Sequence, residues 1–381
     1  MLGALTSCGN AAVPAAAEAA RPFTATPVAS FSSPWAMAFL TGSGRPLLDA
    51  ALVTEKAGKL WLVDTRTGAK TAVAGVPAVN VAGQGGLGDV AVHPDFVVNR
   101  RVYLSFVEKG PGGSGAALGY GRLLMTSAAK PGAPVGVSLD GFKVIWRQSP
   151  KVDGNGHFSH RIAFGRDRLL YLTSGERQKF TPAQDLSGNL GKVLRLTDEG
   201  TPAPGNPWAS RGGVAATFWS IGHRNLLGLS FAPDGRLWES EMGPKGGDEI
   251  NLIRPGLNYG WPRASNGSNY DNSDIPDHRP GDGFEPPKVY WTPSISPGAM
   301  MIYSGGKFPG WKGDALVGAL SGEALIRVDI DGDKARKADE WPMGARIRAV
   351  DEGPNGSVWL LEDEGRLLRL DPRPQSSARR R

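Results

Sequence analysis

A two-strand motif recurs along the chain, and this repetition limits the folds that the chain can adopt. Each copy has an apolar strand, a turn with Pro, Asp, Asn or Gly, and a second strand with an aromatic residue near its centre. Clear copies lie at 90–107, 162–176, 229–243 and 350–363, and weaker ones at 51–71 and 315–333. The turn residues supply the positive φ angles that hairpins need. A spacing of roughly 60–70 residues indicates a fold built from one repeated unit.

The glycine and proline content points the same way. The chain has 381 residues, of which 53 are Gly and 30 are Pro, and long helices tolerate both types poorly. No long amphipathic helical pattern is present, and no apolar run approaches the roughly 18 residues of a membrane span. About six units fill residues 28–372. The sequence therefore predicts an all-β chain, a six-bladed β-propeller.

The longest irregular stretch, 258–297, is rich in Pro, Gly, Asn and Asp. On a propeller, such an insertion would lie over one face, where loops commonly build the functional site. We therefore expect this segment to border the site.

The two ends of the chain differ in composition from the repeats. Cys8 is the only cysteine and lies in the sequence LTSCG at 5–9, ahead of an alanine-rich linker. This resembles a bacterial lipobox, so residues 1–27 are interpreted as a lipoprotein-like signal and linker that would anchor an exported, periplasmic protein through Cys8. A free thiol in a leader is the alternative, because no Lys or Arg precedes the short apolar stretch, as a signal requires; a start codon placed too late would explain this. Residues 373–381 are expected to form a disordered basic tail.

The charge of the chain gives little information about partners. The formal net charge is +6, but part of it lies in the terminal tail, and elsewhere Lys and Arg mix with Asp and Glu. Without a concentrated basic face, we expect no nucleic-acid partner. The segment GQGGLG at 83–88 fits a dinucleotide pattern, but a strand is expected directly after it where that fingerprint needs a helix.

Polar residues gather in segments where a strand pattern would favour apolar ones. These segments are 154–161, 219–225, 241–251 with 258–262, and 346–348. If 157–161 is a regular strand, alternation places His157, Ser159 and Arg161 on one face and turns His160 to the other. Residues three apart on a strand could not share one zinc ion, so a metal site at His157 and His160 is disfavoured. Arg346 and Arg348 would share a face, which suits a ligand with several carboxylates.

The order and spacing of these motifs resemble the soluble quinoprotein glucose/sorbosone dehydrogenases, and most closely their bacterial aldose sugar dehydrogenase branch. The matching segments are GQGGL at 83–87, HFSHR at 157–161, GHRN at 222–225, GP at 243–244, DEIN at 248–251, YGWP at 259–262 and RIR at 346–348. The resemblance implies a six-bladed propeller that binds pyrroloquinoline quinone (PQQ) and Ca²⁺. It implies oxidation of aldose sugars to lactones with an unidentified electron acceptor.

The resemblance also implies roles for individual residues. His157 would be the general base, and Arg224 and Asn225 would lie beside the quinone oxygens, where Arg224 stabilises developing charge. The cofactor would be held by Gln84, Arg224, Asn225, Arg346 and Arg348. The carbonyls of Gly243 and Pro244 would bind the calcium ion at the cofactor, and Glu249 with the Tyr259 carbonyl would bind a second, structural calcium ion. For Asp248 and Glu249, an exposed loop is the alternative.

Some positions depart from the family pattern. A lysine usually found near the quinone falls on Ser321 here, which removes one cofactor contact. Met242 and Gly156 also replace residues that are often polar, before Gly243 and His157 respectively. Two other functions therefore stay open: a calcium-dependent, lactonase-like hydrolase, and a non-catalytic sugar-binding propeller.

Overall fold

The chain is built almost entirely of β-strands. The computed structural model describes residues 18, 20–42, 45–126 and 136–374. Of the predicted signal and linker at 1–27, residues 1–17, with Cys8, and residue 19 lie outside this range, as do residues 375–381 of the predicted tail. Residues 23–27 of the predicted linker belong to strand β1 (Phe23–Ser30). Among the described residues, no helix is long and apolar enough to cross a membrane. The all-β prediction is confirmed, because apart from Glu18 the helical residues in the described ranges form one short α-helix and four 3₁₀ turns: α2 (Phe96–Asn99), η1 (Thr181–Gln184), η2 (Ala209–Arg211), η3 (Gly213–Thr217) and η4 (Pro309–Trp311).

The first half of the chain forms an eight-stranded sheet and a four-stranded sheet. The eight-stranded sheet joins two antiparallel runs through the parallel pair β5 and β9. Its strands are β2 (Pro34–Gly42), β3 (Arg45–Glu55), β4 (Lys59–Asp64), β5 (Lys70–Ala74), β6 (Leu87–Val92), β7 (Arg101–Gly110), β8 (Gly113–Thr126) and β9 (Gly136–Arg147). The next sheet has β10 (Ser159–Phe164), β11 (Leu170–Ser174), β12 (Lys192–Leu196) and β13 (Phe218–Ile221).

The second half forms three four-stranded sheets and one small ribbon. One sheet has β14 (Leu226–Phe231), β15 (Leu237–Glu241), β17 (Asp248–Ile253) and β19 (Val289–Trp291), and the ribbon pairs β16 (Lys245–Gly246) with β18 (Gly267–Ser268). The next has β20 (Pro297–Ile302), β21 (Ala315–Ala319), β22 (Ala324–Asp331) and β23 (Lys334–Pro342). The last has β24 (Ile347–Glu352), β25 (Val358–Glu362), β26 (Arg366–Pro372) and β1 (Phe23–Ser30).

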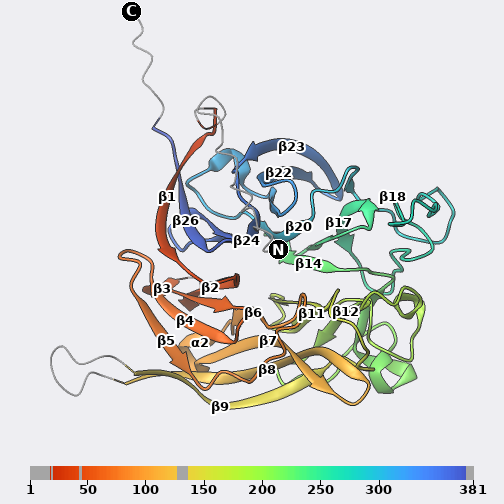
Figure 1. Ribbon diagram of the computed structural model, residues 1–381, viewed down its shortest axis with the longest axis horizontal. Helices are drawn as coiled ribbons and strands as arrows, with labels where there is room; N and C mark the ends of the chain where they lie inside the picture. The colour runs from red at the N-terminus through yellow and green to blue at the C-terminus, as the bar shows by residue number, and fades with distance from the viewer. Residues whose placement is uncertain (1–17, 19, 43–44, 127–135, 375–381) are drawn as a thin grey trace, which may run out of the picture.

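The sheets follow one another around a common centre in sequence order (Figure 1). Within the described residues, the strands β2, β6, β10, β14, β20 and β24 contact one another in turn, and β24 contacts β2 again. The ring is also closed at the rim, because β1 pairs with β26 from Phe23–Pro372 to Ser30–Arg366. Red β1 and blue β26 lie side by side in Figure 1. The two ends of the described chain are therefore held in one sheet.

The predicted hairpins are present, and their turns use the expected residues. The motif at 229–243 forms β14 and β15, where Gly235 adopts φ +92 and the Asp234 carboxylate accepts a hydrogen bond from the Arg236 N–H at 3.0 Å. The motifs at 90–107, 162–176 and 350–363 likewise form the first two strands of their units. The two weaker copies begin one strand later, on β3–β4 and β21–β22.

The core lies between neighbouring sheets and is apolar. One cluster joins the sheets of β14–β19 and β20–β23 through buried side chains such as Trp238, Ile250, Val317 and Ile326. Burial of such side chains contributes roughly 25 cal/mol per Å² of apolar surface, which favours the face-to-face packing of the sheets.

A buried guanidinium links the inner ends of all these sheets. Arg161 on β10 donates to the carbonyls of Leu227 at 2.7 Å and Gly298 at 2.7 Å, and reaches that of Arg348 at 3.5 Å. It also pairs with the Asp89 carboxylate at 3.1 Å and stacks 4.0 Å from the centre of the Trp35 ring. These partners belong to β14, β20, β24, β6 and β2, so one side chain contacts every strand of the inner ring.

We predict that Arg161→Met lowers the free energy of unfolding by about 3–5 kcal/mol, because it leaves the Asp89 carboxylate buried without its partner. Urea unfolding followed by tryptophan fluorescence measures this change.

Two further variants separate the buried charge from general damage. Adding Asp89→Asn to Arg161→Met should restore part of the loss, since the unpaired charge is then removed. Arg236→Met breaks a surface ion pair with Asp333 and should change the unfolding curve little. An Arg161→Met protein as stable as the parent would contradict the central role of this residue.

Candidate active site

A cavity of about 250 Å³ opens where the inner strands begin. Of the residues that the sequence predicts for the site, Gln84, Asn225, Arg346 and Arg348 line it. The remaining lining residues are Trp35, Lys56, Gly83, Phe158, Ser159, His160, Leu227, Met242, Ser296 and Leu320. Segments far apart in the sequence therefore meet at one end of the strand ring.

His157 does not line this cavity, but it precedes Phe158, which does, and it is held from two sides. Its backbone N–H donates to the Gln84 side-chain oxygen at 2.7 Å, and its Nδ1 contacts the Glu176 carboxylate. Glu176 also accepts the backbone N–H groups of Gln178 at 2.9 Å and Phe180 at 2.6 Å. The imidazole is thus oriented by a buried carboxylate that is itself fixed by the backbone.

The electrostatics of this pair define the histidine tautomer. Burial raises the pKa of Glu176, but the hydrogen bond and charge of His157, the Phe180 N–H and the Arg224 charge together outweigh burial and lower the pKa overall. An ionised carboxylate only accepts hydrogen bonds, so Nδ1 of His157 carries the proton and Nε2 is free to accept one. Burial lowers the pKa of His157, while the Glu176 contact opposes this effect. The neutral imidazole is therefore the form present at neutral pH.

The prediction that His160 turns away from the site is wrong. His157, Ser159 and His160 adopt φ values of 48, 59 and 66, so the first residues of β10 and the backbone before them are not a regular strand and do not alternate their side chains. His160 lines the cavity, where its Nδ1 meets the Ser105 hydroxyl at 2.7 Å and its ring stacks on Trp35 at 5.1 Å. Burial lowers the pKa of His160 to about 3, which leaves this ring neutral.

One wall of the cavity carries an excess of positive charge. The Nε atoms of Arg346 and Arg348 share the Asp363 carboxylate at 3.1 and 2.8 Å. In the part of the chain that the structure describes, their terminal Nη atoms have no hydrogen-bond partner. Lys56 faces the same cavity, and its pKa is lowered by burial and then by the Arg348 charge. Three cations and one carboxylate favour an anionic ligand.

Lys56 is a site residue that the sequence analysis missed. Its ammonium group donates to the Gly83 carbonyl at 3.0 Å, beside Gln84. Ser321, at the position of the expected lysine, does not line the cavity, and its hydroxyl bonds to Ser296 at 2.9 Å. A lone Lys after a strand gives no functional signal in the sequence. Glu176 was also missed, because a lone Glu after a strand gives no functional signal either, although it ends the repeated motif at 162–176.

Arg224 lies next to the cavity and does not line it. Its Nη1 donates to the carbonyls of Met242 at 2.9 Å and Gly243 at 2.8 Å, and its Nη2 to the Tyr270 hydroxyl at 3.2 Å. Its guanidinium lies 5.1 Å from the centre of the Trp261 ring. One of the two carbonyls predicted to bind calcium, that of Gly243, thus already meets a cationic group.

The segment after β15 is fixed by a buried aspartate. One Asp248 oxygen accepts the Gly243 N–H at 2.9 Å, and the other accepts the N–H groups of Ile295 and Ser296, both at 2.7 Å. Asp248 and Glu249 lie on β17 and are buried, so the alternative of an exposed loop for these two residues is wrong. This arrangement fixes the backbone at Gly243, but neither Gly243 nor Pro244 lines the larger cavity.

Glu249 and Tyr259 meet in a second, small cavity of about 10 Å³. Glu241 and the Arg224 side chain also line it. This volume is at the lower limit for holding one water molecule. Burial raises the pKa of Glu249 well above its usual value, and the Glu241 charge adds to the effect. The oxygen atoms around a small volume are the donor type that calcium prefers.

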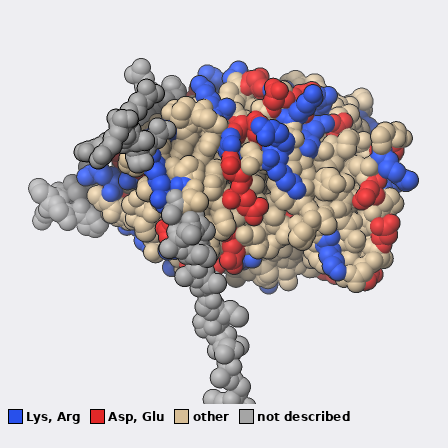
Figure 2. Space-filling view, turned by 90° about the horizontal axis from the view of Figure 1, so that it is seen from above, with Lys and Arg blue, Asp and Glu red and all other residues tan. Residues whose placement is uncertain are grey.

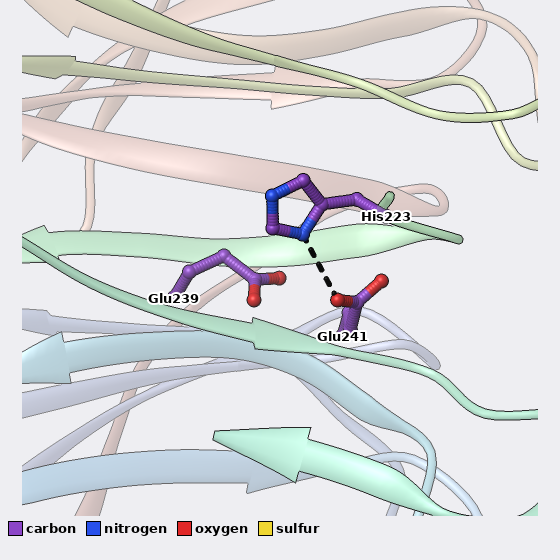
Figure 3. Close-up of side chains that lie close together, drawn as sticks. All are labelled: His223, Glu239 and Glu241. Carbon is purple, nitrogen blue, oxygen red and sulfur yellow. Dashed lines mark hydrogen bonds and ion pairs between the residues drawn. The ribbon is translucent and has the colours of Figure 1, made fainter. Parts of the chain in front are cut away.

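A buried acidic cluster extends from this small cavity (Figure 3). Nδ1 of His223 meets Glu241 at 3.1 Å, and Glu239 lies close enough for ligand atoms of all three residues to fall within 4.8 Å of one another. The Asn251 amide nitrogen lies 3.2, 3.3 and 3.2 Å from Glu239, Glu241 and Glu249. An amide has two hydrogens for these three carboxyls, and burial raises the pKa of Glu239 well above its usual value.

The outer surface shows no comparable separation of charge on the face in Figure 2. Lys and Arg are interspersed with Asp and Glu there.

Comparisons with known proteins agree with this geometry. The family model described as Glucose / Sorbosone dehydrogenase matches residues 31–369. Aldose sugar dehydrogenase YliI of Escherichia coli (strain K12) is 38% identical over 349 residues, which cover 89% of this chain and 90% of that protein.

Solved structures are similar over most of the chain. A crystal structure of a glucose dehydrogenase has a TM-score of 0.83 and 42% identity, covering 91% of this chain and 99% of that one. The PQQ-bound form of aldose sugar dehydrogenase from Streptomyces coelicolor has a TM-score of 0.70 and 30% identity, covering 92% of this chain and 98% of that one.

We predict that the His157 imidazole titrates below the ordinary histidine value of about 6.5, because burial disfavours its charged form. Glu176→Gln should lower the midpoint further, since the carboxylate that supports the charged form is lost. NMR of histidine-labelled protein measures both midpoints, and the chain has only 5 His to assign.

The signal that disappears in His157→Gln identifies the residue. A midpoint that rises in Glu176→Gln would contradict the assigned pairing.

Proposed function

The chain belongs to the glucose/sorbosone dehydrogenase family, and we propose that it oxidises aldose sugars at C1 to lactones, with PQQ as the hydride acceptor. The observation that carries this proposal is the His157–Glu176 pair beside a cavity with a cationic wall. A neutral base and an anion-binding wall are the two features that such a reaction requires from the protein. The S. coelicolor relative with PQQ bound supports the choice of cofactor.

We interpret the architecture as a six-bladed propeller. The support is the ring of β2, β6, β10, β14, β20 and β24, each the first strand of a four-stranded run. The pairing of β1 with β26 would complete the last blade and close the ring. In this interpretation the cavity lies on the propeller axis.

The cavity wall fits a cofactor that carries several carboxylates. Arg346 and Arg348 would bind carboxylates with their free Nη atoms, and Lys56 would supply the ammonium group that Ser321 cannot. Gln84 and Asn225 would contact polar atoms of the ring system. Bound PQQ would supply the two-electron acceptor that takes the hydride from C1 of the sugar.

His157 performs the proton transfer in this proposal. Nε2 accepts the proton of the C1 hydroxyl as the C1–H bond breaks with its electron pair, and the C1–O bond becomes the lactone carbonyl. Glu176 holds the imidazole in the correct tautomer and stabilises the imidazolium that forms. Arg224, 2.8 Å from the Gly243 carbonyl, would have to turn from this contact to reach developing charge in the cavity.

We propose two calcium sites from the donor atoms present. At the cofactor, calcium would bind the Gly243 and Pro244 carbonyls and would compete with Arg224 for the first of them. The second ion would bind Glu249 and the Tyr259 carbonyl, where it would offset the repulsion between buried carboxylates.

The cellular setting is also a proposal. We propose export to the periplasm, with a lipid anchor on Cys8, from the lipobox-like sequence at 5–9. An electron acceptor of unidentified chemistry would then reoxidise the cofactor outside the cytoplasm.

We predict that the purified protein reduces a redox dye with glucose only after PQQ and calcium are added. Calcium should restore chelated protein better than magnesium, because magnesium demands octahedral geometry and dehydrates reluctantly. In the reconstituted protein, His157→Ala should lower kcat by roughly 10²–10⁴-fold, the usual contribution of an acid–base group.

A PQQ titration by absorbance controls this experiment, because His157→Ala should still bind the cofactor. Full dye reduction without PQQ would contradict the proposed function.

We predict that Arg346→Ala and Arg348→Ala each weaken PQQ binding roughly ten- to a hundredfold. A hydrogen bond to a charged group contributes about 1.5–3 kcal/mol, and about 1.4 kcal/mol corresponds to tenfold in affinity. Arg→Lys should recover only part, since an ammonium group lacks the planar fork.

Lys56→Met tests the residue that replaces the missing lysine and should weaken binding in the same assay. Superimposable titration curves for all these variants would remove the cationic wall from cofactor binding.

A further inference from the structure

A second buried arginine, Arg177, lies next to the base, and the proposed reaction gives it no role. Its side chain is 0% exposed. The acceptors that its guanidinium meets in the described residues are backbone carbonyls and one hydroxyl, and none is a carboxylate. A cation without a paired carboxylate is costly to bury, and an apolar side chain of similar volume often packs at lower cost. Packing alone therefore does not account for a charge at this position.

These acceptors belong mainly to the backbone that leads into His157. Nε donates to the Gly156 carbonyl at 2.9 Å, and Nη2 donates to the Gly154 carbonyl at 2.6 Å. Nη1 donates to the Ser114 carbonyl at 2.5 Å, on the neighbouring strand β8. Residues 153–158 lie outside the strands, so no strand ladder satisfies the two glycine carbonyls. The planar fork of one guanidinium binds them together and joins them to β8.

The same guanidinium supports the residue that follows His157. Its central carbon lies 3.7 Å from the centre of the Phe158 ring, and Phe158 lines the cavity. The backbone N–H of Arg177 also donates to the His157 carbonyl at 3.3 Å. Arg177 therefore contacts the base itself and the residues directly before and after it.

The two residues before Arg177 contact His157 as well. A Cβ at Gly175 would lie 2.1 Å from the His157 carbonyl oxygen, so only glycine allows this close approach. Glu176 binds the imidazole Nδ1. His157 adopts φ 48, a left-handed conformation that is uncommon outside glycine and persists only where surrounding contacts impose it. The tripeptide 175–177 supplies such contacts.

We propose that Arg177 is a positioning residue that holds the backbone of His157 in its left-handed conformation and so aims Nε2 at the C1 hydroxyl of the sugar. Arg177 acts on the backbone of the base, whereas Glu176 acts on its ring. Arg177 does not line the cavity, so it acts through His157 and Phe158. This inference rests on the proposed function, because it assigns a further residue to the same reaction.

The charge of Arg177 also affects the base. Burial lowers the pKa of His157, the charges of Arg224 and Arg177 lower it further, and the hydrogen bond and charge of Glu176 oppose them. Removing the positive charge of Arg177 should therefore raise the titration midpoint of His157. A lysine at the same position retains the charge and should keep the midpoint.

The test is a double-mutant cycle in the PQQ-loaded full-length protein, with kcat expressed per bound PQQ. Arg177→Lys should lower kcat roughly ten- to a hundredfold, because an ammonium group lacks the planar fork and a misplaced reacting group costs up to about a hundredfold. In the His157→Ala background, the same change should alter kcat less than about twofold, since no imidazole is left to aim. An equal loss in both backgrounds would indicate general damage and overturn the proposal.

NMR of histidine-labelled protein gives a second measurement that needs neither PQQ nor sugar. The His157 midpoint should rise in Arg177→Met and keep its parent value in Arg177→Lys. The parent midpoint in a folded Arg177→Met protein would contradict the assigned contact between this charge and the base. If Arg177→Met does not fold, the cycle with Arg177→Lys decides alone.

Arg195→Lys is the matched control. Arg195 on β12 also donates to a backbone carbonyl, that of Pro204 at 2.8 Å, and its guanidinium lies 4.8 Å from the centre of the Trp219 ring. It does not line the cavity, so this change should leave kcat and the His157 midpoint as in the parent. A loss of kcat equal to that of Arg177→Lys would overturn the specific role of Arg177.

The outcomes separate the two proposals. If the parent protein oxidises glucose and Arg177→Lys retains the parent kcat, the positioning role is wrong and the proposed function stands. If the parent protein does not oxidise glucose, the proposed function is wrong, and the His157 midpoints alone decide whether Arg177 acts on this imidazole.

Discussion

The Arg161 guanidinium contacts all the strands of the inner ring, and the other features of the site depend on this contact. A buried cation is tolerated only where carbonyls and a carboxylate surround it, so the carbonyls of β14 and β20 and the Asp89 carboxylate must converge on one point. Because these groups must all reach Arg161, each inner strand has a fixed position relative to its neighbours. The cavity begins directly beside it, since Trp35, Leu227 and Arg348 contact Arg161 and also line the cavity.

A fixed ring of strand ends explains how distant residues form one site. Gln84 and Asn225 lie just before β6 and β14, and Arg348 is the second residue of β24. The start of β10 adds a local feature, because left-handed backbone at His157, Ser159 and His160 lets Phe158, Ser159 and His160 all line the cavity, which a regular strand would not allow. Glu176, at the end of the neighbouring strand, then holds the imidazole. The sheets set the positions of the site residues, and the irregular backbone around His157 sets the directions of its neighbouring side chains.

The parts of the fold that could be predicted are those that depend on local sequence. Turn residues such as Asp234 and Gly235 revealed the hairpins, whereas β2 and β20 were missed in the two weaker repeats although glycines follow both strands. The pairing of β1 with β26 joins opposite ends of the chain and leaves no local pattern. Family motifs identified Gln84, Asn225 and the arginine pair, but Lys56 and Glu176 matter only through contacts that the folded chain creates.

Like charges lie close together at the site, and their repulsion lowers the stability of the ligand-free protein. Lys56, Arg346 and Arg348 face one cavity with a single carboxylate between them, while Glu239, Glu241 and Glu249 meet in a buried cluster nearby. Met242 lines both cavities, so a single residue separates the two concentrations of opposite charge. Each costs free energy until a ligand of opposite sign binds, and binding to the folded state alone stabilises it. An anionic cofactor on one side of Met242 and a cation on the other would therefore stabilise the fold together, which physically connects the proposed cofactor and calcium sites.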